Sequence, residues 1–218
     1  MLSILSVSVY ALVDAELVSR SATVDSRIIE AAKLENGKLF GALERDSEYV
    51  IGWLNIYNTH INYPITQGKD NAWFLNRNYR GEFATAGSIF LDYRNQNDFT
   101  DNFSIIYGHR MGNGEMFSDI HYFEDKKYFN EHQEGLLRLR GVDIPISIVA
   151  YAKIDARDWT VYNAEKSRND NNVVSYIFKL AKVRGGYADM DGDYILLSTC
   201  DGSEKDKRDV LLARLVRG

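Results

Sequence analysis

The stretch "YILLSTCDGSEKDKRDVLLARLV", from Tyr194 to Val216, consists of two apolar runs joined by a charged loop. Both runs are short and rich in Leu, Ile and Val, which is typical of two neighbouring β-strands. Cys200 follows the first run, so we expect its side chain at the end of a strand, where it can reach a surface groove. Arg208 opens the second run, and pairing between the two strands would bring it beside the cysteine.

Strand-like segments of the same kind fill most of the chain from Tyr49 onward. They are rich in β-branched and aromatic residues and are separated by Gly, Asn and Asp, as strands joined by turns are. The upstream segments are YVIGWLNIYNT (49–59), INYPITQ (61–67), GSIFLDYR (87–94), FSIIYGHR (103–110) and LLRLRGVDIPISIVAYAKI (136–154). Seven or eight such strands predict a closed β-barrel or a β-sandwich.

Three segments have helical spacing instead. Residues 15–34 and Leu39–Asp46 precede the strands, and Asn36 with Gly37 between them is a predicted helix stop. A third helix is expected at Asn171–Val183. Its predicted buried face carries Val173, Val174, Ile177, Leu180 and Ala181. We therefore predict a mainly β fold with N-terminal helices and one extra helix in the long connection before the cysteine-bearing strand.

The composition limits the classes of function. With 218 residues, 45% of them hydrophobic, the chain is long enough for one well-buried core. Lys and Arg total 26 against 31 for Asp and Glu, and a net charge of −5 gives no electrostatic reason to expect nucleic acid. A single cysteine excludes an intramolecular disulfide and any Cys-rich zinc site. We expect neither a metal nor a cofactor.

One acidic run resembles a calcium-binding loop only superficially. In DMDGD, residues 189–193, glycine stands at the fourth position, whereas a calcium loop of the EF-hand type needs it at the sixth. Cys200 also falls where the bidentate Glu of such a loop belongs. We interpret the run as a turn that leads into the strand YILLST.

The N-terminal segment MLSILSVSVYALV, residues 1–13, is apolar but too short to cross a membrane. Asp14 interrupts it well before the roughly 20 apolar residues that a membrane-spanning helix needs. No basic residues precede it, as they would in a complete signal peptide. It is either a packing helix or the outer end of a signal anchor.

The lone cysteine needs partners if it is to act as a nucleophile, because a neighbouring His or cation must favour its thiolate. His109 is the best candidate base, since it ends a strand-like run and precedes the Gly-rich turn RMGNGEMF. We interpret His60, His121 and His132 as surface or packing residues. Arg208 is the candidate cation, although the charge pattern by itself favours a solvated position within EKDKRD. An inert, buried thiol is the alternative to a reactive one.

These features occur together in one known family. The segment IGWLNIYNTHINYPITQGKDNAWFLNRNYRGEFATAGSIFLDYRN (51–95) is followed by IIYGHRM and then by LLSTCDG, with an Arg opening the next strand. In combination this pattern resembles the sortases, and class B sortases in particular. The resemblance runs from about Val50 to the C-terminus. The helical N-terminal segment and the helix before the cysteine-bearing strand carry the class B assignment.

The resemblance implies an eight-stranded β-barrel and the activity of a cysteine transpeptidase. Cys200 would attack the carbonyl after the threonine of a five-residue sorting signal, and His109 would protonate the leaving amine. Arg208 would stabilise the oxyanion, together with the backbone N–H of Asp201. Turnover that needs thiolate and imidazolium together is expected to be slow and bell-shaped in pH.

Further positions match the family's signal-binding groove. They are Asn71, Leu75, Tyr107 and Ser198. Each of them fits a structural role equally well, as core, turn or half-buried strand residue.

Partners and location are also implied by the resemblance. The substrates would be secreted proteins that bear a sorting-signal pentapeptide, and the acceptor would be an amine of a peptidoglycan precursor. The enzyme would face outward from the cytoplasmic membrane of a Gram-positive bacterium on a single N-terminal anchor. The expected organisation is an anchor remnant (1–14), a helical segment (15–48) and a catalytic barrel (49–218). A cysteine protease that releases its product to water, and a non-catalytic surface β-barrel, stay open as alternatives.

Overall fold

The computed structural model describes most of the chain. The described residues are 24, 26–32, 36–170, 172–186, 192–199 and 206–217. The predicted nucleophile Cys200 and the predicted oxyanion donor Asp201 lie outside them. So do the apolar N-terminal segment, the first part of the predicted helix 15–34 and most of the acidic run 189–193.

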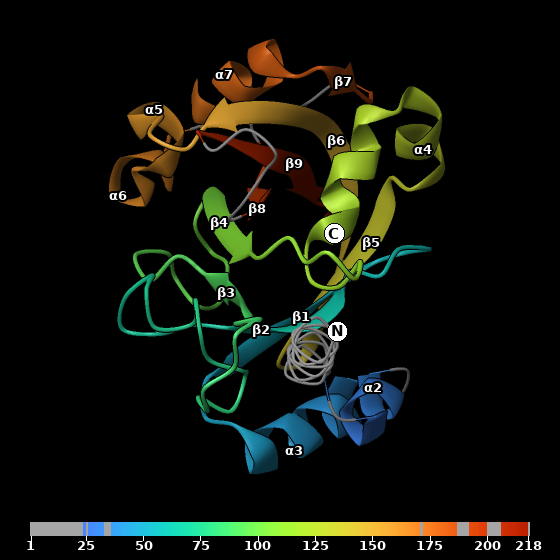
Figure 1. Cartoon of the computed structure of the whole chain (residues 1–218), viewed down its shortest axis with the longest axis vertical. Helices are drawn as coiled ribbons and strands as arrows, with labels where there is room; N and C mark the ends of the chain where they lie inside the picture. Colours follow the sequence, from blue (N-terminus) through green and yellow to red (C-terminus); the bar gives the residue numbers. More distant parts are fainter. Residues whose placement is uncertain are drawn as a thin grey trace, which may run out of the picture.

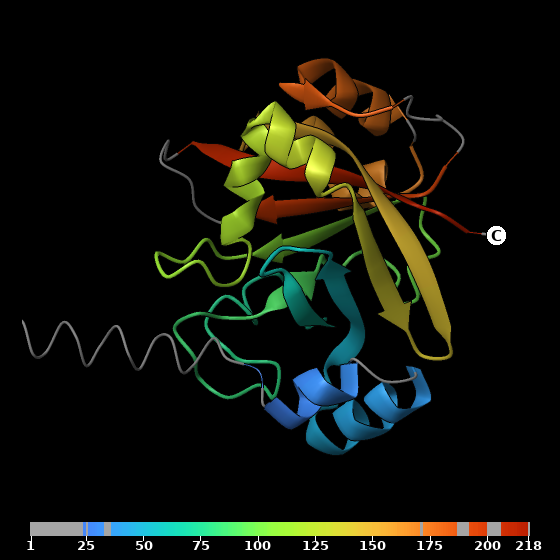
Figure 2. The same ribbon diagram turned by 90° about the vertical axis from the view of Figure 1, so that its right-hand side faces the viewer.

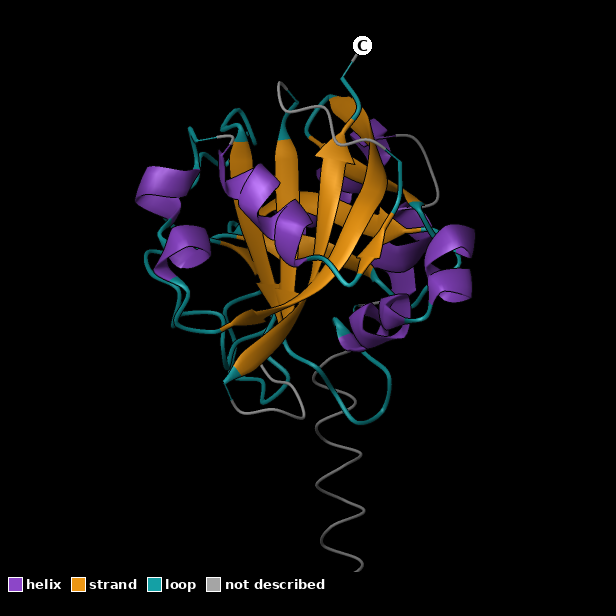
Figure 3. Cartoon of the chain, turned by 90° about the horizontal axis from the view of Figure 1, so that it is seen from above, coloured by secondary structure: helices purple, strands orange, loops and turns teal. Residues whose placement is uncertain are grey.

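The strands of the described residues form one sheet that closes into a barrel (Figure 3). The strands are β1 (Val50–Ile56), β2 (Asn62–Thr66), β3 (Ile89–Leu91), β4 (Phe103–Gly108), β5 (Glu134–Leu139), β6 (Val142–Asp155), β7 (Val183–Arg184), β8 (Tyr194–Thr199) and β9 (Lys207–Leu215). Their order is β5-β1-β2-β3-β4-β8-β9-β6-β7, and β5 also pairs with β6, which closes a ring of eight strands. The predicted eight-stranded barrel is confirmed. The two-residue β7 pairs with β6 outside this ring and was not expected.

Short helices cover the barrel on two sides, with α2 and α3 at one end of the view and α7 at the other (Figures 1 and 2). The described helices are α2 (Ser26–Ala32), α3 (Asn36–Asp46), the 3-10 helix η1 (Ser118–Glu124), α4 (Lys126–Glu131), α5 (Trp159–Tyr162), α6 (Ala164–Ser167) and α7 (Asn172–Leu180). In the part of the chain that the structure describes, no helix combines the length and the apolar character needed to span a membrane.

The apolar run of β8 reflects coverage of the sheet on both faces. All six residues of the strand are buried. Ile195 and Leu197 belong to the core inside the barrel, whereas Tyr194 and Leu196 belong to a second cluster, formed with α5, α6 and α7 on the outer face. Successive side chains of a strand point to opposite faces, so a strand that is covered on both sides is apolar at every position.

The predicted helix before the cysteine-bearing strand is α7. Its residues Val173, Val174 and Ile177 are buried against the sheet, as expected. The helix ends at Leu180, earlier than predicted, because Val183 and Arg184 pair with β6 as β7. Leu180 is exposed, so the prediction that it lies on the buried face is wrong.

The predicted break between the two N-terminal helices lies a few residues earlier than expected, because α2 ends at Ala32 and Asn36 and Gly37 already belong to α3. The side-chain amide of Asn36 donates to the carbonyl of Leu139 over 2.8 Å and to the carboxylate of Asp143 over 2.6 Å. Its amide oxygen accepts from the backbone N–H of Gly141 over 3.0 Å. These bonds join the start of α3 to the β5–β6 turn, more than 100 residues away, and local turn chemistry cannot anticipate them.

Candidate active site

The predicted base and nucleophile follow two strands that lie side by side. β4 and β8 are parallel, and their register pairs Gly108 with Thr199, the last residue of each strand. His109 comes directly after β4, and Cys200 comes directly after Thr199 in the sequence. Parallel strands end at the same edge of a sheet, so the barrel holds the two attachment points together.

Arg208 lies at the same edge, on the neighbouring strand β9. β8 and β9 are antiparallel, with Ser198 opposite Val210. The Nη1 atom of Arg208 donates to the carbonyl oxygen of Thr199 over 2.8 Å. The side chain is half-buried, so Arg208 is not the fully solvated charge that its neighbours in the sequence allowed.

The His109 ring is held by a main-chain carbonyl. Its Nε2 atom lies 2.8 Å from the carbonyl oxygen of Leu75. A carbonyl oxygen only accepts, so this geometry assigns a donor hydrogen to Nε2. The Leu75 carbonyl is placed in turn by Gly87, which has a positive φ of 61° and where an added Cβ would lie 2.7 Å from that oxygen.

A pocket of 250 Å³ opens beside Arg208 and contains four of the residues predicted for the site. Its lining consists of Asn71, Leu75, Phe90, Tyr107, Ala156, Tyr162 and Arg208. Segments that are widely separated in sequence supply these side chains. The Tyr107 ring packs between Phe90 and Tyr162, with ring centroids 5.3 and 6.4 Å away. Three aromatic rings therefore line the pocket, and its polar groups are an amide, a guanidinium and two tyrosine hydroxyls.

A buried carboxylate, Asp92, organises the polar side of this pocket. It accepts from the Asn71 amide over 2.8 Å, from the Tyr107 hydroxyl over 3.1 Å and from Arg94 over 2.7 Å. Arg94 also donates to the carbonyl of Tyr162 over 3.1 Å. Asp92 thus fixes three residues that line the pocket, two of them directly and Tyr162 through Arg94.

The same contacts shift two pKa values. Burial by itself would raise the pKa of the Asp92 carboxyl, but hydrogen bonds from Arg94 and Asn71 outweigh it and hold the pKa below its ordinary value. Burial raises the pKa of Tyr107, and the charge of Asp92 raises it further. The Tyr107 hydroxyl therefore stays protonated and donates to a carboxylate that stays ionised.

Ser198, the remaining predicted groove residue within the described chain, is fully buried. Its hydroxyl lies 3.1 Å from that of Tyr162, so it reaches the pocket through this tyrosine.

The other histidines lie elsewhere and make structural contacts. His60 pairs with Asp119 over 3.0 Å, and His132 bonds to the carbonyl of Tyr128 over 2.7 Å. His121 bonds to the carbonyl of Ser118. Their interpretation as surface or packing residues agrees with these contacts.

Sequence reasoning missed Asp92, Arg94, Tyr162 and the carbonyl of Leu75. Asp92 and Arg94 did leave a signal, since an acidic residue at the end of the apolar run SIFL, with an arginine two positions later, is typical of a buried ion pair. Tyr162 ends α5, a helix of four residues that is too short to leave a helical period in the sequence. A main-chain carbonyl leaves no trace in side-chain patterns at all.

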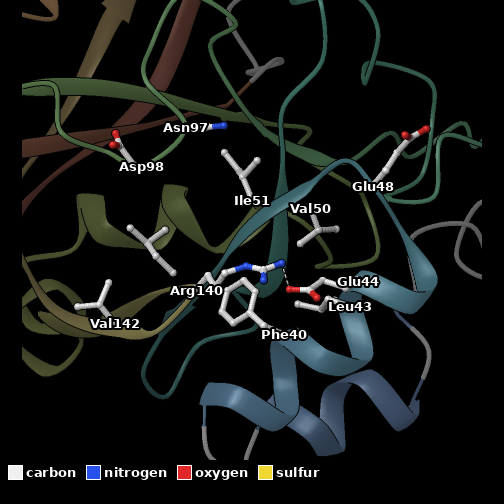
Figure 4. A pocket seen from close by; sticks show the side chains of 11 residues that line it. Phe40, Leu43, Glu44, Glu48, Val50, Ile51, Asn97, Asp98, Arg140 and Val142 are labelled. Atoms are coloured by element: carbon white, nitrogen blue, oxygen red, sulfur yellow. Dashed lines mark ion pairs between the residues drawn. The ribbon is translucent and has the colours of Figure 1, made fainter.

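A second cavity, of 450 Å³, lies where α3, the start of β1 and the β5–β6 turn meet (Figure 4). Phe40, Leu43 and Val50 give it apolar walls, and Glu44 pairs with Arg140 beside them. No residue predicted for the site lines this cavity. It is separate from the candidate active site.

Comparison with known proteins agrees with this geometry. A family model described as the sortase domain matches residues 54–216, about three quarters of the chain. The chain belongs to the sortase family. The sequence is 49% identical to sortase B of Listeria monocytogenes over 90 residues, which are 41% of this chain and 37% of that protein. It is 27% identical to sortase B of Staphylococcus aureus over 184 residues, which are 82% of this chain and 75% of that protein.

Solved sortase structures share the fold. A class B sortase of Streptococcus pyogenes, involved in pilus biogenesis, matches with a TM-score of 0.74 at 30% identity, covering 84% of this chain and 100% of that chain. The crystal structure of the Staphylococcus aureus sortase B matches with a TM-score of 0.74 at 23% identity, covering 84% and 88%. The predicted class B assignment is confirmed, and with it the enzyme class, a cysteine transpeptidase of the sortase B family.

Proposed function

We propose that this sortase cleaves a C-terminal pentapeptide sorting signal after its threonine and transfers the protein to an amine of a peptidoglycan precursor. The observation that carries the proposal is the register of β4 and β8, which ends both strands at one edge, with Arg208 beside them. Cys200 is the nucleophile, His109 the acid and base, and Arg208 the oxyanion donor. The backbone N–H of Asp201 is the second proposed donor.

The first half-reaction forms a thioester. The Cys200 thiolate attacks the carbonyl carbon after the threonine, and the negative charge that develops on the carbonyl oxygen is stabilised by Arg208. A guanidinium has five N–H donors, so the bond from Arg208 to Thr199 orients the group while further donors remain for the oxyanion. The carbon–nitrogen bond then breaks, and His109 gives its proton to the leaving amine.

The second half-reaction releases the product. The acceptor amine attacks the thioester, the carbon–sulfur bond breaks, and the thiolate of Cys200 is restored. His109 takes up the proton that the amine loses, so it acts as acid in the first step and as base in the second. With Nε2 bound to Leu75, the exchanging atom is Nδ1.

The pentapeptide occupies the pocket of 250 Å³ described above. Asn71 and Tyr107 supply its polar contacts, Leu75 supplies apolar contact, and Ser198 acts through Tyr162. The proposed substrates are secreted proteins that carry the signal. The proposed location is the outer face of the cytoplasmic membrane of a Gram-positive bacterium, with an N-terminal anchor, residues 15–48 as a helical segment that packs on the barrel, and residues 49–218 as the catalytic barrel.

The test is mass spectrometry of the protein incubated with a panel of sorting-signal pentapeptides, with and without a small peptide amine. We expect cleavage after threonine, a product that carries the added amine, and loss of both in Cys200→Ala and His109→Ala. Cleavage with water as the only acceptor would identify a protease instead. No cleavage of any peptide, together with resistance of Cys200 to alkylation in the folded protein, would overturn the proposal.

A further inference from the structure

A buried carboxylate on β9, next to the candidate active site, has partners on three segments. The Tyr151 hydroxyl donates to Oδ1 of Asp209 over 2.6 Å, and Nη1 of Arg110 lies 3.6 Å from its Oδ2. The backbone N–H of Asp209 donates to Oγ1 of Thr199 over 3.1 Å. Asp209 therefore touches β6, the end of β8 and the residue that follows His109.

Packing alone does not call for a carboxylate at this position. Along β9, Leu211 and Ala213 belong to the core inside the barrel, while Val210 and Leu212 belong to the outer cluster. Because side chains alternate along a strand, Asp209 belongs to the same face as Leu211 and Ala213, inside the barrel. Its side chain is only 6% exposed. An ionised carboxylate at an apolar position costs free energy unless it is paired and hydrogen-bonded. The interactions with Tyr151 and Arg110 provide that compensation.

The segment that contains His109 is attached on two sides. The carbonyl of His109 accepts from the backbone N–H of Phe117 over 2.9 Å, and Arg110 forms an antiparallel bridge with Met116. These contacts join the segment to the loop that leads into η1. The Arg110–Asp209 pair joins it to β9, and so to the strand whose backbone also holds Thr199.

We propose that Asp209 is a positioning residue for the transpeptidation reaction. It holds Arg110, and with it the main chain of His109, at a fixed place relative to Thr199, the residue before Cys200. Acid–base catalysis on a thioester depends on the distance between imidazole and sulfur, and a misplacement of about 1 Å can cost roughly 100-fold in rate. The inference rests on the proposed function, because the distance between the His109 imidazole and the Cys200 sulfur matters only if these two residues carry out the proposed reaction.

The test uses Asp209→Asn and Arg110→Gln, singly and combined. Asparagine keeps the size of the side chain and an oxygen that accepts from Tyr151, but it removes the charge that faces Arg110. We expect each single variant to lower kcat for peptide cleavage roughly 10- to 100-fold with KM within about twofold. The double variant should be no slower than either single one, because both remove the same interaction.

Arg80→Gln is the matched control. It removes a guanidinium that pairs with Asp46 over 2.6 Å and is 31% exposed, against 32% for Arg110, but it lies among the loops near α3. This control should leave kcat unchanged. If Asp209→Asn and Arg110→Gln both keep kcat within twofold of the control, or if their effects multiply in the double variant, the proposal is wrong.

Hydrogen exchange separates this proposal from the proposed function. If the wild-type protein cleaves no peptide, the proposed function fails, but the positioning claim still predicts faster amide exchange across residues 109–117 in both variants and not in Arg80→Gln. Unchanged exchange in that segment would overturn the positioning role independently of any activity.

Discussion

Arg208 forms a hydrogen bond with Thr199, the residue that precedes the predicted nucleophile. Its Nη1 atom donates to the carbonyl oxygen of Thr199 over 2.8 Å. The next residue of β9, Asp209, binds the side-chain oxygen of Thr199 through its backbone N–H over 3.1 Å. Two consecutive residues of one strand thus hold both oxygen atoms of Thr199. The end of β8 is fixed where the proposed chemistry needs it fixed.

Replacing Arg208 should abolish most of the activity. In Arg208→Lys a point charge replaces the planar fork that can bind Thr199 and an oxyanion at once, so we expect kcat to fall roughly 100- to 1000-fold with KM little changed. Kinetics of pentapeptide cleavage measure this, with Lys207→Gln as a neighbouring control. If Arg208→Lys keeps more than about a tenth of kcat, the oxyanion role is wrong.

Gly87 should be needed for the geometry of His109. In Gly87→Ala the new Cβ would lie 2.6 Å from the carbonyl oxygen of Phe74 and 2.7 Å from that of Leu75, at a φ of 61°. Relief of that contact moves the carbonyl that holds His109, so we expect lower kcat together with a loss of stability of about 1–3 kcal/mol.

Gly112→Ala is the control for this change, because nothing lies within 4 Å of its added Cβ and its φ is not positive. Urea unfolding and cleavage kinetics are measured for both variants. Equal behaviour of the two would show that the Leu75 carbonyl does not depend on Gly87.

Asp92→Asn should change the acid sensitivity of the fold. The folded-state pKa of Asp92 lies below its ordinary value, so its charge stabilises the protein above pH 3.8, and this contribution is lost as the pH falls through the folded-state pKa. Removing the carboxylate leaves Arg94 without its buried partner, which should cost about 3 kcal/mol at pH 7. The difference from wild type should shrink as the pH falls below 3.8.

Urea unfolding at pH 7 and at pH 3 measures this difference. Asp98→Asn serves for comparison, because hydrogen bonds from Thr100 also lower the pKa of Asp98, but its side chain is exposed. An Asp92→Asn defect that is the same at both pH values would contradict the linkage.

Asn36→Ala should destabilise the protein and leave catalysis intact. The substitution removes bonds to Leu139, Gly141 and Asp143, and the backbone groups of the β5–β6 turn lose their partner. We expect a loss of about 2 kcal/mol in the free energy of unfolding. Asn36→Asp should cost at least as much, since it loses the donor and places a second carboxylate next to Asp143. An unfolding midpoint equal to that of wild type would refute the docking role of Asn36.

Local patterns were enough to predict the strands, but they left a barrel and a sandwich open until the family resemblance favoured the barrel. The apolar runs and the Gly, Asn and Asp clusters between them located β1 to β4, β8 and β9 within a few residues and covered β5 and β6 with one run, and the helical period located α7. The order of residues along the chain also placed His109 and Cys200 directly after strands. These features depend on neighbours within a few residues, which a sequence displays directly.

The hydrogen bonds that hold the polar groups of the site depended on the tertiary structure. The bond from His109 to Leu75 spans 34 residues, and the bond from Arg94 to Tyr162 spans 68. The bond from Asn36 to Leu139 spans 103 residues. Side-chain pattern determined which residues could carry the chemistry, because strand ends and turns are local. Only the tertiary structure decided which atoms form hydrogen bonds with these residues. A buried polar group bonds to the donors and acceptors that the closed barrel brings within about 3 Å of it.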